Sequence, residues 1–450
     1  MIAAALTQVG LASPQGKWSA VTSGGEQSTI SNIGVARTKD GVLHVVWQRD
    51  NGSAYDLLQS SISPSGSASA PVPIVTGWNS VGGADLVVGP NGELMAFWAG
   101  NRTVDPSESL FGLNLATSTD GGKSWALTPS SIYTKFYAYG RTPSVAVFNG
   151  IPIQTWYYIG EPVVHVGLDP SPDVPLYSPP GLNESIAAGS DGVAIAWCNG
   201  IDTPPGVWVA PVDPSSGAAA GDARRLPGSA TVYDGKEVTS CPAASRTALA
   251  ARVGGGFFAA ALAGYPSQTK VLVWQVGSPT SAVVAQTSQS FSIGAVALAA
   301  APDGRIWVGW SASTSGGPTV YFRRSNRSAT AWGAVVAVRA PSDFFLNLDL
   351  DAQPDRLDVL GRFQSSNNIV NVFHTQVLPG LTLVAKGGNV ATFRVLDAGD
   401  PVAGAAVKVG GKTLKTNSKG VASLDLPAGK YKATASKGGF VSASVSVKTS

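Results

Sequence analysis

Few residues of this chain combine a reactive type with a spacing that could do chemistry. The three histidines, His44, His165 and His374, lie far apart, and no cluster of histidine, cysteine or carboxylate residues has the spacing of a metal site. No serine has the flanking glycines of a hydrolase nucleophile elbow, and no glycine-rich loop has the pattern of a phosphate-binding site. The sequence therefore predicts no metal and no cofactor.

The two cysteines are a second candidate for chemistry. Cys198 directly follows Trp197, and Cys241 stands just before an apolar run that we expect to be a strand, so both thiols could lie on one face of neighbouring sheets. Two cysteines are too few to identify a compartment. A disulfide between Cys198 and Cys241 and two free buried thiols therefore both remain open.

One short motif has a defined local chemistry, which is structural. Ser118, Asp120, Gly122 and Trp125 form the pattern Ser-x-Asp-x-Gly-x-x-Trp. The carboxylate of Asp120 can accept hydrogen bonds from the amides of its own turn, and Gly122 can adopt the positive φ that the turn needs. Trp125 can then pack back onto the sheet. The motif predicts a tight turn between two strands.

The elements that position these residues repeat along the chain. Five Asn/Asp-Gly turns are each followed, five or six residues later, by a tryptophan that closes an apolar run: Asp40-Gly41 to Trp47, Asn91-Gly92 to Trp98, Asn149-Gly150 to Trp156, Asp191-Gly192 to Trp197 and Asp303-Gly304 to Trp310. Degenerate copies near Gly256 and Asp355 fill the gaps, which gives a period of roughly 50 residues. Such turns join strands in hairpins, so the repeat predicts an all-β chain.

A repeat of this length is typical of a β-propeller, whose blades are four-stranded antiparallel sheets. We predict seven blades over residues 17–380, with six as the alternative because the copy near Gly256 is weak. The segment from Lys17 to Thr22 resembles the outer strand from Ala70 to Thr76, and we expect it to complete the last blade. Residues 1–16 are interpreted as an N-terminal leader or the remnant of a secretion signal.

Composition and charge separate the tail from the rest. With 53 Gly, 30 Pro and 13% charged residues, the chain is rich in turns and strands, and no stretch is long and apolar enough for a transmembrane helix. Residues 381–450 hold ten basic and three acidic residues, a net charge of +7, against −4 for the remainder. We predict a separate small β-sandwich there. Its lysines have almost no interleaved aromatic residues, which disfavours a nucleic acid partner.

The motif at Ser118 resembles the Asp box, or BNR repeat, of the sialidase (neuraminidase) superfamily, where it is structural and carries no catalysis. The run from Val87 to Arg102 also looks like the first catalytic blade of bacterial sialidases. In that family an arginine opens the strand and a glutamate follows it, but Gly82 and Ala99 occupy those positions here. Arg102 is present, and Asp105 stands where the acid/base aspartate is expected.

The resemblance implies further site residues. Arg141 resembles the family's Arg-x-Pro motif, and Arg246 opens a later inner strand, so Arg102, Arg141 and Arg246 would clamp an acidic sugar. Tyr157 would be the nucleophile and Glu161 its relay, with Asp105 as the acid. Tyr158 and Glu184 would bind the ligand at the same axial face. Each residue also has a structural interpretation, as a turn cap, an ion pair or a rim residue.

The tail resembles a second family. The runs from Val402 to Val409, from Thr416 to Gly420 and from Leu426 to Tyr431 alternate strands with turns, and they are similar to the carboxypeptidase regulatory-like, transthyretin-like sandwich, an Ig-like β fold. Such sandwiches are often appended to secreted bacterial proteins. The resemblance implies a spacer that positions or attaches its neighbour.

Two functional classes follow from these observations. In the first, the protein is secreted or displayed at the cell surface, and its axial face binds a glycan or a surface protein without intact sialidase catalytic residues. In the second, it is a divergent exo-glycosidase that acts on an acidic sugar. The incomplete catalytic pattern favours binding, and a place as a subunit of an extracellular assembly is open.

Overall fold

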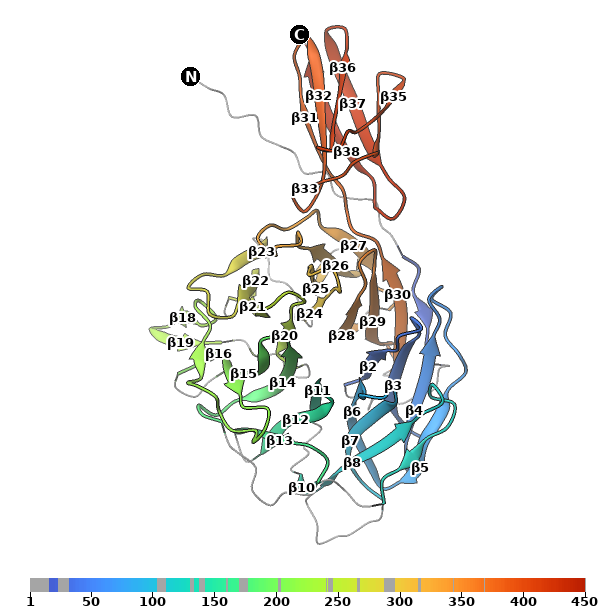
Figure 1. Ribbon diagram of the computed structural model, residues 1–450, viewed down its shortest axis with the longest axis vertical. Helices are drawn as coiled ribbons and strands as arrows, with labels where there is room; N and C mark the ends of the chain where they lie inside the picture. Colours follow the sequence, from blue (N-terminus) through green and yellow to red (C-terminus); the bar gives the residue numbers. More distant parts are fainter. Residues whose placement is uncertain are drawn as a thin grey trace.

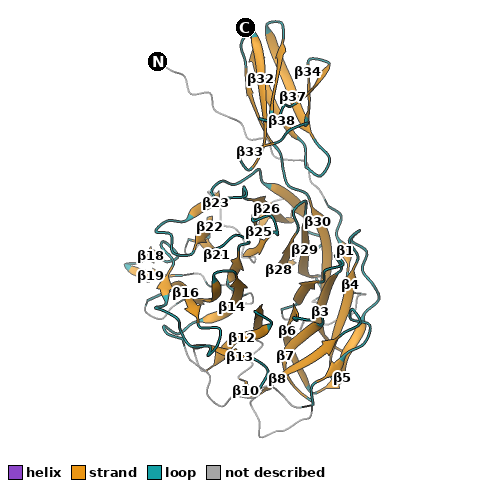
Figure 2. Cartoon of the chain, in the orientation of Figure 1, coloured by secondary structure: helices purple, strands orange, loops and turns teal. Residues whose placement is uncertain are grey.

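The structure, a computed structural model, describes most of the chain. Its described residues are 16–22, 32–102, 111–129, 133–136, 142–158, 161–169, 177–200, 204–239, 241, 246–264, 268–286, 296–314, 317–342, 344–367 and 369–449. These residues form strands, turns and loops but no helix (Figure 2), and none of them belongs to a helix that could span a membrane. The all-β prediction is confirmed.

Antiparallel sheets surround a central opening like the blades of a β-propeller (Figure 1). The first three sheets are β2-β3-β4-β5 (Gly34–Arg37, Leu43–Asp50, Tyr55–Ile62, Val72–Trp78), β6-β7-β8-β10 (Ser80–Val88, Leu94–Asn101, Phe111–Ser118, Tyr133–Phe136), with β9 (Ala126–Leu127) also on β8, and β11-β12-β13 (Ser144–Phe148, Ile151–Tyr158, Glu161–Val166). The fourth is β14-β15-β16-β17 (Leu182–Gly189, Gly192–Asn199, Gly206–Val212, Arg224–Arg225), followed by a hairpin of β18 and β19 (Thr231–Tyr233, Lys236–Val238).

The sheets that follow continue the same plan. They are β20-β21-β22-β23 (Ala248–Ala251, Phe257–Ala263, Lys270–Gln275, Ala282–Gln286), β24-β25-β26-β27 (Val296–Ala300, Ile306–Thr314, Gly317–Arg324, Val336–Arg339) and β28-β29-β30-β1 (Phe344–Ala352, Leu357–Gln364, Val370–Val377, Ser19–Ala20). The inner strands contact one another in the order β2, β6, β11, β14, β20, β24 and β28, and β28 contacts β2. The contacts therefore close a ring.

The turns of the sequence repeat connect strands in hairpins, and its tryptophans are buried. At one turn Asn149 (φ 50°) and Gly150 (φ 82°) connect β11 to β12, and Phe148 pairs with Ile151. Positive φ at both positions is what a two-residue hairpin of this twist requires. The five repeat tryptophans are 2% exposed or less: Trp47, Trp98, Trp156, Trp197 and Trp310. They fill the space between neighbouring sheets.

The chain start and the last ring sheet are joined by pairing. Ser19 pairs with His374 and Ala20 with Phe373 on β30, which is the pairing expected of the segment from Lys17 to Thr22. Trp18 adds an indole N–H donated to the carbonyl of Arg339 (2.8 Å) and an edge-on contact with Phe363. The outer strand of the last sheet thus comes from the other end of the sequence.

Buried charges join the first sheet to the last. Arg37, at the end of β2, donates to Asp351 (2.7 Å) and to Asp358 (2.6 Å). Asp358 also accepts hydrogen bonds from His374 (2.9 Å) and Gln376 (3.0 Å). We call Arg37, Asp351, Asp358 and His374 the closure cluster. The guanidinium bridges strands that are more than 300 positions apart in the sequence.

Residues 381–449 form two further sheets. One contains β31, β32, β33 and β36 (Thr382–Lys386, Val390–Asp397, Asp400–Pro401, Val421–Asp425), and the other is β35-β34-β37-β38 (Lys412–Lys415, Ala406–Val409, Gly429–Ser436, Ala443–Thr449). Side chains from both sheets form one apolar core, which includes Phe393 and Val407. The two sheets stand against one side of the ring (Figure 1).

The closure cluster gives a stability prediction. Replacing Arg37 by methionine leaves Asp358 buried and removes the shortest of its ion pairs (2.6 Å, against 3.3 Å to Arg356), so we expect the free energy of unfolding to fall by about 3 kcal/mol. Urea unfolding at neutral pH measures the change. The matched control is Lys39→Met, because Lys39 is exposed nearby and should change stability by about 0.5 kcal/mol or less. Equal effects of the two substitutions would mean that the cluster does not hold the ring together.

Candidate ligand site in the axial cavity

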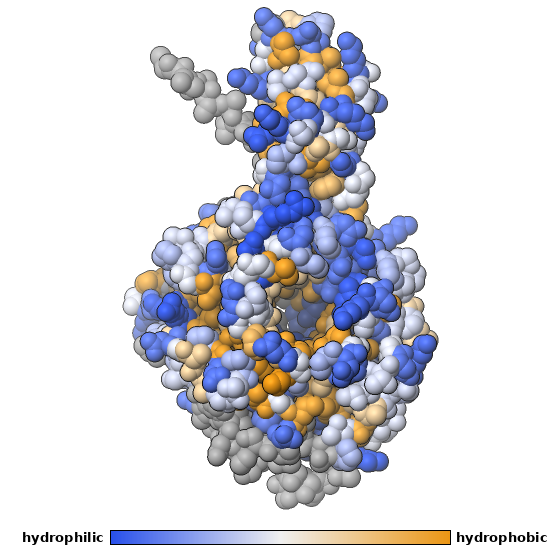
Figure 3. Space-filling view, in the orientation of Figure 1, coloured by the Kyte–Doolittle hydropathy of each residue, from blue (hydrophilic) through white to orange (hydrophobic). Residues whose placement is uncertain are grey.

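The inner strands enclose a cavity of about 300 Å³ on the ring axis. Its opening is visible in the space-filling view, where polar and apolar surface alternate around it (Figure 3). Every inner strand contributes to the lining, and the polar lining residues are Asn32, Asp85, Ser144, Ser185, Arg246, Thr247, Asn347 and Asp349. The axial face, where the sequence analysis expected a ligand, therefore has a polar hollow.

Arg246 reaches across the interior of this cavity. It precedes β20, yet it forms an ion pair with Asp85 on β6 (3.2 Å between Nη1 and Oδ1). Its Nη2 also donates to the carbonyl oxygen of Pro143 (2.6 Å). Since β11 and β14 lie between β6 and β20 in the ring, the guanidinium links sheets that are not neighbours. Arg246 thus lines the cavity and also cross-links two parts of the ring.

The carboxylate of Asp85 is fully engaged by the protein. The amide of Val145 donates to Oδ2 (2.7 Å), and the amide of Leu86 donates to Oδ1 (2.9 Å), which also faces Arg246. Each oxygen therefore has at least one donor, as a buried carboxylate requires. Asp85 is a structural group that connects β6 to β11 and to Arg246, the residue two positions before β20.

Asp349, on β28, is in the opposite situation. Its Oδ2 is buried and has no hydrogen-bond partner among the described residues. Burial raises the pKa of Asp349 to about 6, and the negative charge of Asp85 adds to the rise, whereas Arg246 and Arg362 oppose it. A half-buried carboxyl that lines a cavity with an unmet hydrogen-bonding capacity is typical of a functional position.

Arg362 is the cation behind Asp349. It lies on β29 directly opposite Asn347, and burial lowers its pKa to about 10, against the favourable charge of Asp349. Two arginines therefore flank one free carboxyl at the cavity wall. This arrangement favours the ionised form of Asp349 at neutral pH and allows its protonation at mildly acidic pH.

The other polar lining residues connect adjacent sheets. Asn347 donates to the side chain of Asn32 (2.7 Å), the amide of Ile186 donates to Ser144 (3.2 Å), and Ser185 donates to the carbonyl of Thr247 (2.6 Å). We call these contacts, together with Asp85 to Val145, the inner belt. Three side-chain atoms of the lining are buried without a hydrogen-bond partner among the described residues: Oδ2 of Asp349, Oγ1 of Thr247 and Nε of Arg246, and Asp349 supplies the carboxylate among them.

The cavity can bind a small polar ligand. An ionised Asp349 can accept hydrogen bonds from ligand hydroxyl groups, and a protonated one can donate one. Within the described ranges, no three His, Cys, Asp or Glu residues gather closely enough to hold a metal ion. The chemistry available here is therefore hydrogen bonding by the Asp349 carboxyl and the Thr247 hydroxyl, and proton exchange by Asp349, beside an arginine.

The structure brings few of the predicted site residues together. Arg246 lines the cavity, and Glu184 is buried on β14 next to the lining residue Ser185. Arg102 follows β7 and is exposed. Asp105 and Arg141 lie outside the described residues, so their predicted roles stay predictions.

The predicted relay between Tyr157 and Glu161 does not match the strand register. In the β12–β13 hairpin, Tyr157 stands opposite Pro162, and Glu161 stands opposite Tyr158, whose side chain is outside the description. Side chains of residues that face each other share one side of a sheet, and their sequence neighbours point to the other side. Tyr157 and Glu161 therefore project from opposite faces of the hairpin, which their proximity in the sequence did not reveal.

The motif at Ser118 forms the expected turn. Asp120 accepts hydrogen bonds from the amides of Lys123 and Ser124, both at 3.0 Å, and from the hydroxyl of Ser118 (2.8 Å). The hydroxyl of Ser124, which donates to Asp120 at 2.6 Å, acts together with these bonds to hold the pKa of Asp120 well below its usual range. Gly122 has a φ of 83°, and a Cβ there would lie 2.7 Å from Gln59 of the preceding sheet. Trp125 packs against the core between these sheets.

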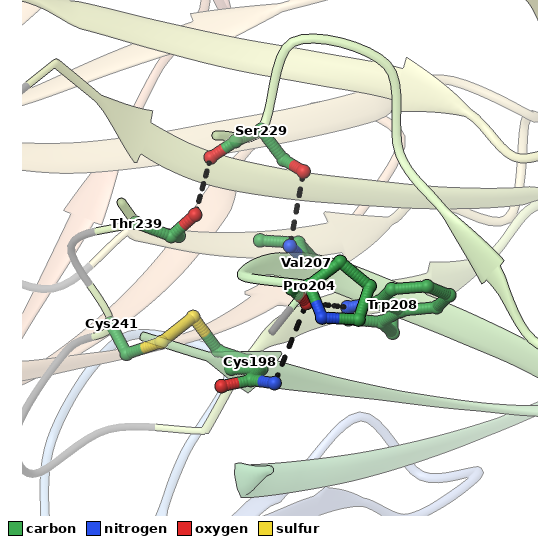
Figure 4. Close-up of a disulfide and its surroundings, with 8 residues drawn as sticks. Cys198, Pro204, Val207, Trp208, Ser229, Thr239 and Cys241 are labelled. Atoms are coloured by element: carbon green, nitrogen blue, oxygen red, sulfur yellow. Dashed lines mark hydrogen bonds between the residues drawn. A yellow bond between two sulfur atoms is a disulfide. The ribbon is translucent and has the colours of Figure 1, made fainter. Parts of the chain in front are cut away.

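The cysteines are paired. Cys198 and Cys241 form a disulfide with Cα atoms 5.7 Å apart (Figure 4). Hydrogen bonds organise the chain around it, including Val207 N–H to the hydroxyl of Ser229 (3.0 Å) and Thr239 hydroxyl to the carbonyl of Ser229 (3.1 Å). Of the two states that the sequence left open, the structure has the disulfide.

The sequence reasoning missed Asp85 and Asp349, although a signal existed. Asp85 interrupts the apolar run from Ala84 to Val88, and Asp349 stands between Leu348 and Leu350. A carboxylate inside an inner strand is costly to bury unless it is paired or has a task. Looking for acids within the apolar runs, rather than for a family's motif, would have selected both residues.

Comparisons with known proteins give no family. No protein-family model and no curated protein matches the sequence. Similar solved structures include a protein of unknown function from Dyadobacter fermentans (13% identity, 81% of this chain and 99% of that one, TM-score 0.43). Others are the α-L-arabinofuranosidase of Fusarium graminearum (11%, 83% and 97%, TM-score 0.44) and an α-L-arabinanase of Penicillium chrysogenum (14%, 83% and 98%, TM-score 0.44), both bound to arabinobiose. At these values the likenesses carry no argument about function.

Asp349 gives a prediction about pH. Because its pKa rises from 3.8 unfolded to about 6 folded, the native state binds more protons between these values, and this group lowers stability as pH rises through the window. Asp349→Asn does not carry this penalty. As pH rises from about 4 to about 6, its free energy of unfolding should therefore increase relative to that of the wild type, by up to about 2 kcal/mol after allowance for solvent in the cavity.

Urea unfolding across about pH 4 to 8 tests this. Asp355→Asn is the control with the same charge change, since the Asp355 side chain is 70% exposed. A stability difference between Asp349→Asn and the wild type that does not vary with pH would contradict the raised pKa.

Proposed function

We propose that this protein is a glycan-binding β-propeller whose axial cavity holds one sugar residue. The observation that carries the proposal is Asp349, a carboxyl group on the cavity wall with a buried oxygen that lacks a partner among the described residues. Sugar hydroxyl groups are donors that such a carboxylate can accept from. The volume of about 300 Å³ lies at the lower end of small-ligand sites, which suits a single ring.

The occupancy of Asp85 favours binding over hydrolysis. Most glycoside hydrolases use two carboxyl groups, one as acid and the other as base or nucleophile. Among the residues that line the cavity, the carboxylates are Asp85 and Asp349. Both oxygens of Asp85 already accept hydrogen bonds from the backbone, so a second free carboxylate is not available at this wall.

Hydrolysis of an acidic sugar is the second candidate. A pKa of about 6 would let Asp349 act as a general acid at mildly acidic pH, and Arg246 lies in the same cavity. The resemblance to sialidases would add Asp105 and Arg141 as site residues, and both lie outside the described residues. We rank this function below binding because the relay of Tyr157 by Glu161 is not supported by the register.

The finer points of architecture belong to the same proposal. The order of the inner strands supports seven blades over residues 17–380, and the pairing of β1 with β30 supports closure of the last blade by the N-terminal strand. The shared core of the two terminal sheets supports a transthyretin-like sandwich over residues 381–450. The hydrogen bonds of Asp120 support a sialidase-type Asp box in the second blade.

We also propose an extracellular or cell-surface location. The disulfide between Cys198 and Cys241 supports it, because disulfides persist in oxidising compartments. A glycan partner at the axial face is consistent with such a location.

Binding to a soluble glycan panel tests the function. We expect a subset of sugars to bind the wild type, and Asp349→Ala to weaken that binding by at least about tenfold, as loss of a hydrogen bond to a charged group does. Asp355→Ala should bind like the wild type. Saturation-transfer NMR or calorimetry gives the affinities.

Hydrolysis of aryl glycosides, including a sialoside, separates the two candidate functions. The wild type should show no turnover between about pH 4 and 8, the range in which a carboxyl acid of this kind would act. Turnover that is lost in Asp105→Ala would establish a hydrolase instead. Binding that Asp349→Ala leaves intact would move the glycan site away from the axial cavity.

A further inference from the structure

The second terminal sheet has one face that carries only positive charge. In the order β35-β34-β37-β38, side chains alternate between the core and the outside, and the outer positions of β37 hold Lys430, Lys432, Thr434 and Ser436. Register adds Lys408 opposite Thr434, Ser446 opposite Lys432 and Lys448 opposite Lys430. We call the residues Lys408, Lys415, Lys430, Lys432 and Lys448, with the serines and threonines between them, the basic face. All five lysines are exposed.

The arrangement of these lysines is unfavourable for folding alone. Lys430 and Lys448 stand directly opposite each other, and like charges in that position repel. No lysine in the described part of the chain takes part in an ion pair, since the basic partners there are arginines and one histidine.

The acidic residues that could neutralise this face are used elsewhere. Asp397 pairs with Arg324 (2.6 Å) and Asp400 with Arg305 (2.7 Å), and both arginines belong to the ring. Asp425 is on β36, which belongs to the other terminal sheet. Residues 381–450 contain no other acid. Five of the ten basic residues of the segment 381–450 therefore share a face on which none of its three acidic residues lies.

Part of the basic face lies at the end of the sheet that is remote from the ring. The end of the sheet that touches the ring carries Phe440, over which the guanidinium of Arg324 lies at 5.7 Å, and Val441, which packs in the core of the last ring sheets. Lys430 and Lys448 are at the opposite ends of β37 and β38. The terminal sheets project from the ring in both views (Figures 1 and 3).

Its chemistry selects among anionic partners. The three aromatic residues of the segment are engaged: Phe393 and Tyr431 pack on its own core and Phe440 lies under Arg324. The face therefore offers no ring to stack on nucleic acid bases and no apolar group to enter a lipid surface. It offers ammonium groups interleaved with the hydroxyl groups of Thr434, Ser436 and Ser446, which suit carboxylates and hydroxyls carried on one polymer.

We propose that the basic face binds a linear carboxylated polysaccharide. This site is separate from the axial cavity and does not rest on the proposed sugar site there. Lysines on neighbouring strands, whose backbones lie about 5 Å apart, and lysines at alternate positions of one strand, about 7 Å apart along the backbone, present repeated charges to a chain that carries a charge on each unit. Binding should weaken steeply with salt because the contacts are exposed.

The test uses the full chain and immobilised polygalacturonate, with neutral dextran for comparison. The wild type should bind polygalacturonate and not dextran, and binding should fall as NaCl rises from about 0.05 to 0.5 M. The triple variant Lys430→Gln, Lys432→Gln and Lys448→Gln should bind at least about tenfold more weakly, since three exposed contacts each contribute modestly. Its melting temperature should be unchanged or higher, because the repulsive pair is gone.

A matched triple variant on the ring controls for net charge. Lys123→Gln, Lys236→Gln and Lys270→Gln remove three charges from exposed positions outside the basic face, and this variant should bind within about twofold of the wild type. Equal losses in the two variants would overturn the proposal. So would a wild type that binds anionic vesicles or duplex DNA but not polygalacturonate. Failure of sugar binding in the axial cavity would leave this result unaffected.

Discussion

The inner edges of the ring sheets impose the constraint on which the rest of this structure depends. Each inner strand is hydrogen-bonded to its own sheet on one side only, and the open edge of a strand is a liability. The inner belt supplies side-chain acceptors for backbone amides at these open edges. The amide of Val145 donates to Asp85, and the amide of Ile186 donates to Ser144. Polar residues are therefore obligatory at the axis, and a polar axial cavity follows from the architecture.

This constraint also explains why Asp349 differs from its neighbours. Asp85 belongs to the inner belt and has a donor for each oxygen. Asp349 is surrounded by protein, but its buried oxygen lacks any such donor in the described part of the chain. Leaving a buried acceptor unsatisfied costs about 1–3 kcal/mol. A ligand hydroxyl group that supplied the missing donor would recover part of that free energy. The unsatisfied oxygen in the ligand-free protein would therefore favour binding of such a ligand.

The sequence predicted the fold better than the site. Turns such as Asn149-Gly150 and tryptophans such as Trp156 act locally, and local chemistry can be deduced from neighbours in the chain. The cysteines were found, but only their three-dimensional proximity shows that they pair. Arg246 was predicted as a ligand-binding residue and lines the cavity, but its contacts with Asp85 and Pro143 join residues more than 100 positions away and could not be deduced from neighbours in the chain.

Arginine and lysine have separate roles in this structure. Arginines such as Arg37, Arg305 and Arg324 are buried or nearly so and join elements that are distant in sequence, as suits a planar group that can serve several acceptors at once. Lysines stay on the surface, and those of the basic face lie on sheets held to the ring through Arg305 and Arg324. This division fixes the basic face relative to the axial cavity. The two proposed sites, held at a fixed separation on one body, would act at a high effective concentration toward a single polymer. A long acidic glycan that reached both sites would therefore be held more firmly than either site could achieve alone.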